Sequence, residues 1–388
     1  MKNSRINEKE LVDTLRDLVR IESVNPSLVE GGAGEEEIAE YLKDWMTSQG
    51  LATARYDVEP GRPNVVGVLR GEGGGKTLML NGHMDTVGVE YMNIDPLDPV
   101  VKDGKLYGRG SADMKGGLAA SMLAIKSIVD SGTRLKGDVI LAAVCDEEYA
   151  SIGTEKLMQD TFADAAIIGE PTSCQIQIAH KGFAWVEVET RGLAAHGSAF
   201  KVGVDAITKM GHVLVGIEGI GERLLETEHP LVGPGSVHAS IIEGGRELST
   251  YPDRCRLQLE RRLIPGETSE DVDREMTILL ENIVKNDSEF DASHKTTFYR
   301  GPMEISRRQP ICQLLLKAGE KIMGNPPGFI GGSGWMDTEI IWQKGIPAVA
   351  FGPKGEGIHS KEEYVDLNSV FETAEVHNQV IKEFCKTI

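Results

Sequence analysis

Two observations on the sequence predict an α/β protein into which a second, α+β domain is inserted. At both ends of the 388-residue chain, strand-like apolar runs alternate with helical patterns, as in a sheet covered by helices. In the middle, the pattern changes to the order β-α-β-β-α-β. We therefore expect residues 1–180 and 300–388 to form an outer domain with a mixed, mostly parallel sheet covered by helices, and residues 181–299 to form a ferredoxin-like inserted domain.

Hydrophobic periodicity places the elements of the outer domain. Leu11, Leu15 and Leu18 repeat at helical spacing, whereas short apolar runs such as Val139–Val144 predict buried strands. The expected elements are helices at 7–20 and 38–50, strands at 64–69 and 77–80, a helix at 116–129, and strands at 139–144, 165–168 and 348–351.

The inserted domain is expected to expose one face of its sheet. Apolar and polar residues alternate from Trp185 to Glu189, which is typical of a strand with one face on the core and one in water. The segment contains no candidate metal-ligand set of its own, so we expect the chemistry to lie in the outer domain. Its expected elements are a strand at 183–190, a helix at 204–217, strands at 237–242 and 255–263, a helix at 272–284 and a strand at 293–299.

Composition narrows the classes of partner. The net charge of −19 argues against nucleic-acid and anionic-membrane partners, because both need a basic face. The five cysteines are widely spaced and lack a Cys-x-x-Cys pair, which favours reduced thiols. Residues Met1–Arg5 begin a polar segment without the apolar stretch of a signal peptide, and no run approaches the roughly 18–20 apolar residues of a membrane span. We expect a soluble, cytoplasmic protein.

Five potential metal ligands are placed where a site is expected. Four of them come at or after the ends of predicted strands, and sites in such sheets form beyond the carboxyl ends of the strands. The fifth lies in a glycine-rich turn, where the backbone can approach a buried ion closely. Two histidines and three carboxylates suit two adjacent zinc-like cations and indicate hydrolysis rather than a structural metal. The five are His83, Asp113, Glu148, Glu170 and His359.

Two further carboxylates have expected roles. Asp85 follows His83 by two residues, so it is expected to accept a hydrogen bond from the second imidazole nitrogen. Glu147 and Glu148 lie side by side and repel each other unless a cation absorbs the charge. We assign Glu148 as the ligand and Glu147 as the general base, because a base must reach the water rather than the metal. Taken singly, the His83–Asp85 pair also fits a polar turn, and residues 146–148 also fit a solvated surface run.

Seven motifs, in the order of the chain, together resemble one family of enzymes. They are L-N-G-H-M-D-T-V, G-R-G-S-A-D-M-K-G-G, D-E-E-Y-A-S-I-G-T, G-E-P-T, A-H-G-S, R-R-L-I-P-G-E and G-I-H-S-K-E-E-Y-V. The family is that of acetylornithine deacetylases, succinyl-diaminopimelate desuccinylases, carboxypeptidase G and aminoacylases, which are dinuclear zinc or cobalt amidohydrolases. The resemblance covers nearly the whole chain, and the motifs are specific in combination.

The resemblance implies a role for each candidate in a metal-binding catalytic domain. It implies one cation held by His83, Asp113 and Glu170. It implies a second cation held by Asp113, Glu148 and His359. Glu147 then matches the general acid/base, Asp85 matches the carboxylate that orients the histidine, and the peptide bond after Asp113 is expected to be cis. Zinc is the expected metal, with cobalt and manganese as alternatives, because these ligands discriminate poorly among them.

The inserted domain resembles the lid and dimerisation domain of the family, so we expect a homodimer. His196 matches the histidine that reaches the site of the other subunit and stabilises the oxyanion. Arg262 is our choice for the carboxylate of the substrate, with a structural salt bridge as the alternative. Ser249 stands where the family usually has asparagine, and Ser333 and Trp335 lie in a loop where relatives often have G-T-D. Ser249 and Ser333 are further candidates for substrate binding; a turn residue and a surface aromatic are alternatives for Ser249 and Trp335.

The expected activity is hydrolysis of the amide bond of an N-acyl amino acid, a small-molecule substrate. Glu147 takes a proton from the attacking water and later returns it to the leaving amine. A metallo-exopeptidase acting on dipeptides or C-terminal residues is the alternative enzyme, since the same site serves both reactions. A degenerate metal-binding homologue is the non-enzymatic alternative, and the presence of Glu147 argues against it.

Overall fold

The computed structural model describes residues 6–387, which form two compact units. The polar segment Met1–Arg5 lies outside the described residues. Residues 331–335 group with the second unit, although the sequence analysis assigned them to the outer domain. The first unit comprises the residues up to 178, residues 305–330 and the residues from 336 onward, and the second unit comprises residues 179–304 and 331–335.

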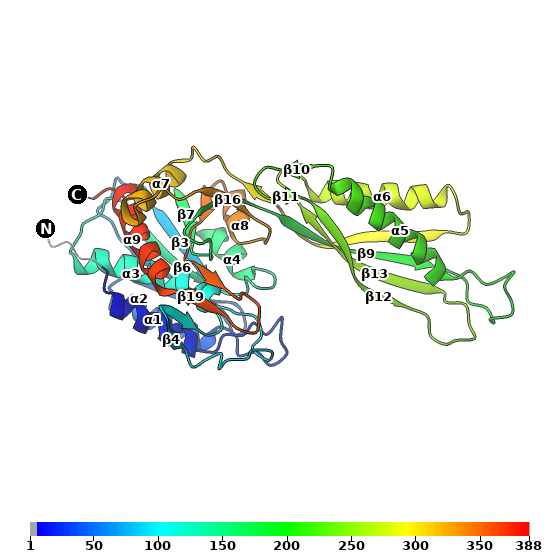
Figure 1. The fold of residues 1–388 in the computed structure, drawn as a ribbon, viewed down its shortest axis with the longest axis horizontal. Coiled ribbons are helices and arrows are strands. Elements are labelled where there is room, and N and C mark those ends of the chain that lie inside the picture. The colour runs from blue at the N-terminus through cyan, green and yellow to red at the C-terminus, as the bar shows by residue number, and fades with distance from the viewer. Residues whose placement is uncertain (1–5, 388) are drawn as a thin grey trace. The chain divides into compact units, whose positions relative to one another are not determined.

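A nine-stranded mixed sheet forms the centre of the first unit (Figure 1). Its order is β1-β2-β6-β3-β7-β17-β8-β15, with β16 paired to β8. Pairing is parallel among the four central strands β6, β3, β7 and β17, whereas β1, β2, β8 and β15 pair antiparallel, so the parallel part is smaller than expected. The strands are β1 (Ala52–Glu59), β2 (Arg62–Leu69), β3 (Leu78–His83), β6 (Val139–Val144), β7 (Ala165–Ile168), β8 (Ile176–His180), β15 (Met303–Glu304), β16 (Phe329–Gly332) and β17 (Ala348–Ala350).

Helices flank this sheet, as the sequence predicted (Figure 1). Helix α3 contacts β3, β6 and α9, while α4 contacts β2 and α8 contacts β7. A smaller sheet has the order β18-β19-β5-β4. The helices are α1 (Glu8–Arg20), α2 (Glu36–Ser48), α3 (Gly116–Asp130), α4 (Ile152–Asp160), α7 (Pro310–Met323), α8 (Thr338–Gln343) and α9 (Leu367–Phe384), and the small strands are β4 (Val100–Lys102), β5 (Lys105–Tyr107), β18 (Gly355–Glu356) and β19 (Tyr364–Asp366).

The central strands are buried along their whole length. Every residue of β3, β6 and β7 is buried, which explains why β6 and β7 are continuous apolar runs rather than alternating ones. Strands β6 and β7 begin and end at the predicted residues. Rigid, buried strands provide a fixed edge from which side chains can be positioned.

The second unit has the predicted β-α-β-β-α-β order, with a pair of two-residue strands, β10 and β11, added between α5 and β12. Its sheet has the antiparallel order β12-β13-β9-β14, and inward and outward residues alternate along β9 and β13. Apolar side chains on one face of the sheet form a core with those of α5 and α6. The elements are β9 (Gly182–Arg191), α5 (Ala206–Leu224), β10 (Glu228–His229), β11 (Gly233–Pro234), β12 (Ser236–Gly244), β13 (Arg254–Leu263), α6 (Ser269–Val284) and β14 (Asp291–Arg300).

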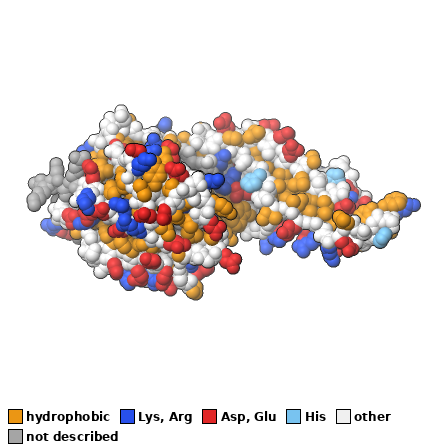
Figure 2. All heavy atoms as spheres, turned by 60° about the horizontal axis from the view of Figure 1, so that its bottom comes forward, with side chains coloured by type: hydrophobic (Ala, Val, Ile, Leu, Met, Phe, Trp, Pro, Cys, Tyr) orange, Lys and Arg blue, Asp and Glu red, His pale blue; other side chains and the backbone are white. Residues whose placement is uncertain are grey.

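Three further features bear on the composition: the distribution of charged side chains, the state of the cysteines and the hydropathy of the helices. Acidic and basic side chains are interspersed over the face shown in Figure 2. All five cysteines are buried and free of disulfide bonds. Among residues 6–387, no helix is both long and apolar enough to cross a membrane.

Candidate metal and catalytic site

The site lies at the carboxyl ends of the central parallel strands. Because β6, β3 and β7 are neighbours and run in the same direction, their carboxyl ends meet at one edge of the sheet. His83 is the last residue of β3, Glu147 and Glu148 follow β6, and Glu170 follows β7. His359 lies in the loop between β18 and β19, in the part of the chain that follows β17, the fourth parallel strand. Close packing of parallel strands therefore brings together residues that are far apart in the sequence.

A tight glycine-rich turn brings Asp113 to the same edge. The turn η1 (Ser111–Lys115) precedes α3, and the peptide bond between Asp113 and Met114 is cis, as the resemblance implied. A Cβ atom at Gly117 would lie 1.8 Å from the carbonyl oxygen of Gly169, the residue before Glu170. Glycine at position 117 thus allows the start of α3 to approach the end of β7 directly.

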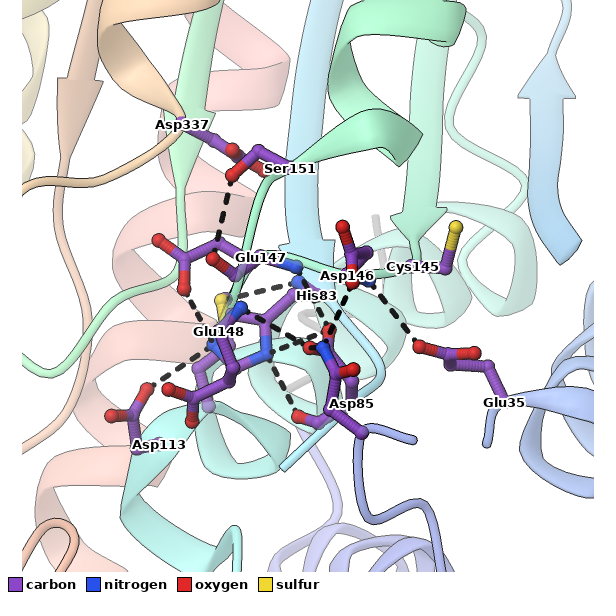
Figure 3. Close-up of polar contacts among 12 residues, drawn as sticks. Glu35, His83, Asp85, Asp113, Cys145, Asp146, Glu147, Glu148, Ser151 and Asp337 are labelled. Carbon is purple, nitrogen blue, oxygen red and sulfur yellow. Dashed lines mark hydrogen bonds and ion pairs between the residues drawn. The ribbon is translucent and has the colours of Figure 1, made fainter. Parts of the chain in front are cut away.

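The five predicted ligands form two groups that share Asp113. His83, Asp113 and Glu170 form one group, Asp113, Glu148 and His359 form the other, and in each group the ligand atoms lie within 4.8 Å of one another. His83 Nε2 lies 3.2 Å from Asp113 Oδ1 and 3.7 Å from Glu170 Oε1. His359 Nε2 lies 3.0 Å from Glu148 Oε2 and 3.4 Å from Asp113 Oδ2. Figure 3 shows Asp85, Asp113, Glu147 and Glu148 around His83.

Glu147 lies beside the two groups but belongs to neither of them. Its Oε2 atom is 4.0 Å from His83 Nε2. Burial, followed by the charge of Glu170, raises the pKa of Glu147 well above its ordinary value. A largely buried carboxylate, 12% exposed, that lies next to a ligand set and outside it has the environment expected of a general base.

The donor set fits divalent cations. Burial, followed by the charge of Asp113, raises the pKa values of Glu148 and Glu170. The Oε1 atom of Glu170 is buried and accepts no hydrogen bond from the described residues. Carboxylates crowded in a buried site repel one another unless positive charge compensates them. Two overlapping groups of imidazole and carboxylate donors offer that compensation to two cations.

The imidazole of His83 is oriented differently from our expectation. Its Nδ1 atom lies 2.9 Å from the backbone oxygen of Asp85, whereas the Asp85 carboxylate is 3.6 Å away. Since a carbonyl oxygen only accepts, Nδ1 of the neutral ring carries the proton, which leaves Nε2 to face Asp113. The Asp85 carboxylate instead accepts hydrogen bonds from the backbone N–H groups of Glu147 and Glu148, each at 3.1 Å.

Glu363, which the sequence analysis did not single out, holds the turn of Asp113. Its buried carboxylate accepts hydrogen bonds from the backbone N–H groups of Ala112 and Asp113, at 2.8 and 3.1 Å. It also accepts from the backbone of Gly110 at 3.1 Å and from Arg109 Nη1 at 2.6 Å. The loop that carries His359 thus also fixes the shared aspartate, through a residue four positions further on.

Asp337 is a second carboxylate that sequence reasoning missed. It is buried, accepts a hydrogen bond from Thr154 Oγ1 at 2.6 Å, and lies near Ser151 in Figure 3. Burial raises its pKa to about 6. Its place in the loop Gly331–Thr338, which departs from the family pattern, was the available signal.

The remaining predicted residues belong to the second unit. His196 is exposed, with Nδ1 2.8 Å from Ser198 Oγ, and Ser249 and Ser333 are exposed as well. Arg262 donates from Nε to Glu260 at 2.6 Å, which is the salt bridge kept open as its alternative role, although about a third of its side chain (32%) stays accessible.

Trp335 is packed rather than exposed on the surface. It is partly buried and meets the rings of His180 and Phe183 edge-on, at centroid distances of 6.2 and 6.3 Å. The guanidinium of Arg300 lies 5.5 Å from the centre of its ring. The surface-aromatic alternative for Trp335 is therefore wrong.

Comparison with known proteins places the chain in a family. The family described as "Peptidase family M20/M25/M40" matches residues 79–383. The chain is 27% identical over 411 residues to N-formyl-4-amino-5-aminomethyl-2-methylpyrimidine deformylase of Bacillus subtilis (strain 168), covering 98% of this chain and 95% of that protein. It is 27% identical over 359 residues to acetylornithine deacetylase of Myxococcus xanthus, covering 90% of this chain and 92% of that protein.

A solved structure shares the fold. The Bacillus subtilis YXEP protein, described as a dinuclear metal binding peptidase from the M20 family, superposes with a TM-score of 0.74 at 16% identity, covering 98% of this chain and 99% of that chain. Because the family match spans more than half of the chain, the protein belongs to peptidase family M20/M25/M40 and is a hydrolase that acts on amide bonds.

Proposed function

We propose that the protein is a dinuclear metal-dependent deacylase that cleaves the amide bond of an N-acyl amino acid. The observation that carries this proposal is the pair of ligand groups sharing Asp113, with Glu147 beside them and outside both. A structural metal needs neither two adjacent ions nor a free base. The arrangement therefore favours hydrolysis at a pair of cations.

The two groups divide the ligands between the cations. His83 and Glu170 would hold the first, Glu148 and His359 would hold the second, and the two oxygens of Asp113 face one histidine each. Bound divalent cations would supply Lewis acidity, which polarises an amide carbonyl and lowers the pKa of water. Zinc suits these imidazole and carboxylate donors, and cobalt and manganese fit them too.

Glu147 supplies the proton transfer. It accepts a proton from the attacking water as the new C–O bond forms, and it returns that proton to the amide nitrogen as the C–N bond breaks. Burial, followed by the charge of Glu170, raises the pKa of Glu147, and a raised pKa favours the return of the proton to the leaving amine. Asp85 holds Glu147 in position through the backbone N–H of that residue.

Residues of the second unit complete the proposal. We assign His196 to the oxyanion of the site of a second subunit, in a homodimer. Arg262, Ser249 and Ser333 are assigned to the substrate. The exposure of His196 supports its role, since its Nε2 atom takes no part in the Ser198 contact. The accessible part of Arg262 leaves room for a carboxylate beside its bond to Glu260.

The relatives support removal of a small acyl group. Two of them are named for release of formyl and acetyl groups, and the YXEP protein is described as a dinuclear metal binding peptidase. An exopeptidase acting on dipeptides is therefore the second candidate. The two differ in whether the substrate carries an acyl cap or a free α-amino group.

The test is a panel of substrates with the zinc-loaded or cobalt-loaded protein. The panel contains N-formyl, N-acetyl and N-succinyl amino acids together with dipeptides, and a chelator and the E147A variant serve as controls. Release of amino acid from the acylated set alone, lost with the chelator and in E147A, is expected. Turnover of dipeptides alone would make the protein a peptidase and overturn the proposal.

A further inference from the structure

A buried arginine lies behind the catalytic loop, at a distance from the ligands themselves. Arg62 begins β2, and only 8% of its side chain is exposed. Its guanidinium donates two hydrogen bonds to the Glu35 carboxylate, from Nε to Oε2 at 2.6 Å and from Nη2 to Oε1 at 2.7 Å. The Nη2 atom also donates to Asp146 Oδ1 at 2.9 Å. One guanidinium thus joins the segment before α2 to the loop after β6.

Asp146 anchors the loop that carries Glu147 and Glu148. Its backbone adopts a left-handed conformation, with φ of 68°, which is uncommon for a residue other than glycine. Its carbonyl accepts the N–H of Ser151 at 2.6 Å, and its Oδ2 atom accepts the N–H of Ala150 at 3.2 Å. The side chain of Asp146 therefore helps to fix the turn in which the base and its neighbour lie.

Asn25 links Arg62 and Asp146 to Asp85. Its Nδ2 atom donates to Asp85 Oδ2 at 2.8 Å and to Asp146 Oδ1 at 3.1 Å, while its Oδ1 atom lies 3.3 Å from Arg62 Nη2. Asp85 in turn accepts the backbone N–H groups of Glu147 and Glu148. Figure 3 shows Glu35, Asp146, Asp85 and His83 lying close together on this side of the site.

Arg62 supplies positive charge to a group of buried carboxylates, namely Glu35, Asp85 and Asp146. Glu35, Asp85 and Asp146 are each at most 2% exposed in their side chains, and Arg62 is the guanidinium that contacts two of them directly. Removing one partner of a buried pair leaves an uncompensated charge, which the local structure relieves by moving. Any such movement would displace Asp85 and the loop after β6.

We propose that Arg62 is a positioning residue of the catalytic site: through Asp146 and Asn25 it holds Asp85, and thereby the backbone of Glu147 and Glu148, in the geometry that proton transfer and metal binding require. The inference rests on the proposed function for the role of Glu147. Its structural part concerns Glu148 and stands on the hydrogen bonds alone. Within the described residues, the Arg62 guanidinium donates hydrogen bonds to Glu35, Ser27, Asn25 and Asp146 and to none of the five predicted ligands, so Arg62 acts through the loop.

The test compares R62M with a matched control, R55M. Arg55 lies on the neighbouring strand β1, is only 19% exposed, and pairs with Glu36, Glu40 and Asp57 at 2.6–3.3 Å, with no contact to the site. At saturating metal, R62M is expected to lower kcat about 10- to 100-fold with KM little changed, whereas R55M keeps the wild-type kcat. Equal kcat values in R62M and R55M would overturn the proposal.

A second readout is independent of turnover. The absorption spectrum of the Co²⁺-loaded protein depends on the geometry of both ligand groups, to one of which Glu148 belongs, so it is expected to change in R62M and to remain unchanged in R55M. If no amide substrate is found, the proposed function fails while this spectrum still decides the positioning role. An unchanged Co²⁺ spectrum in R62M would contradict that role.

A milder variant covers the case in which R62M does not fold. N25A keeps the Arg62–Glu35 pair and removes the link from Asp146 to Asp85. It is expected to lower kcat about tenfold and to change the Co²⁺ spectrum in the same direction as R62M. A folded N25A variant with the wild-type kcat and the wild-type Co²⁺ spectrum would overturn the proposal that Arg62 positions Asp85 through Asp146 and Asn25.

Discussion

The two ligand groups differ in how firmly the fold holds them. His83 belongs to a buried strand, its side chain is 1% exposed, and its ring is fixed by the carbonyl of Asp85. His359 comes from a loop, its backbone has a φ of 57°, and its side chain is 51% exposed. The group of His83 is therefore built by the sheet, whereas the group of His359 depends on a loop that must hold its own conformation.

Asp113 connects the two groups, so its support matters to both. Glu363 accepts the backbone N–H groups of Ala112 and Asp113 from the loop that also carries His359. We call His83, Asp113 and Glu170 the buried group, and Asp113, Glu148 and His359 the exposed group. The buried group should bind its cation more tightly, because fewer ligands must be ordered on binding. The exposed group should bind more weakly and lose its cation first.

The largest expected effect concerns Glu147, which belongs to neither group. E147A should lower kcat by about 10²–10⁴-fold, the usual contribution of general acid–base catalysis, because the proton of the water has no acceptor. Metal content should stay at two equivalents, measured by elemental analysis after dialysis. The neighbouring variant E148A should instead lose metal from the exposed group. Loss of metal in E147A and retention in E148A would exchange the two roles.

The next largest effect is expected for the ion pair of Arg109 and Glu363, which holds the backbone of Asp113. Arg109 donates to Glu363 at 2.6 Å, and both side chains are at most 4% exposed. R109M should reduce the free energy of unfolding by about 3–5 kcal/mol, because it leaves Glu363 buried without its partner. Urea denaturation followed by circular dichroism measures this change.

A surface arginine provides the control for R109M. Arg70 pairs with Asp138 at 2.7 Å and is 69% exposed. R70M should cost at most about 1 kcal/mol, as exposed pairs do. Equal losses in the two variants would show that the pair beneath Asp113 has no special structural weight.

Metal removal should give a smaller effect, in two stages. A ligand that binds only the folded state stabilises it by about 2.7 kcal/mol at a free concentration of about 100 Kd. Titration with a chelator should therefore lower the Tm first by release from the exposed group and then by release from the buried group. A single step that removes both cations together would contradict the difference between the groups.

Much of the fold could be predicted from local patterns. Strands β6 and β7 are continuous apolar runs and were placed with their exact bounds, and the order of the second unit followed from its alternating patterns. The extent of parallel pairing was overestimated, since β2 and β8 pair antiparallel with their neighbours. Strand β1 was missed because its apolar and polar residues alternate and none of them is buried, so it contains no apolar run.

Local patterns also predicted only part of the candidate site. The five residues could be proposed as ligands because each ends or follows a strand or lies in a glycine-rich turn. The supporting residues could not be identified, because Arg62 lies 27 residues from Glu35 and 84 from Asp146, and no local pattern links them. The carboxylate of Asp85 was assigned to His83, although the nearer backbone oxygen takes that role.

The central claim is tested most directly by the metal stoichiometry of H359A beside that of H83A. Isothermal titration with Zn²⁺ should give two equivalents for the wild-type protein, one of them tighter. H359A should keep the tight equivalent and lose the weaker one, while H83A should lose the tight one. H359A that binds two equivalents, or none, would contradict a pair of cations held by a buried group and an exposed group that share Asp113.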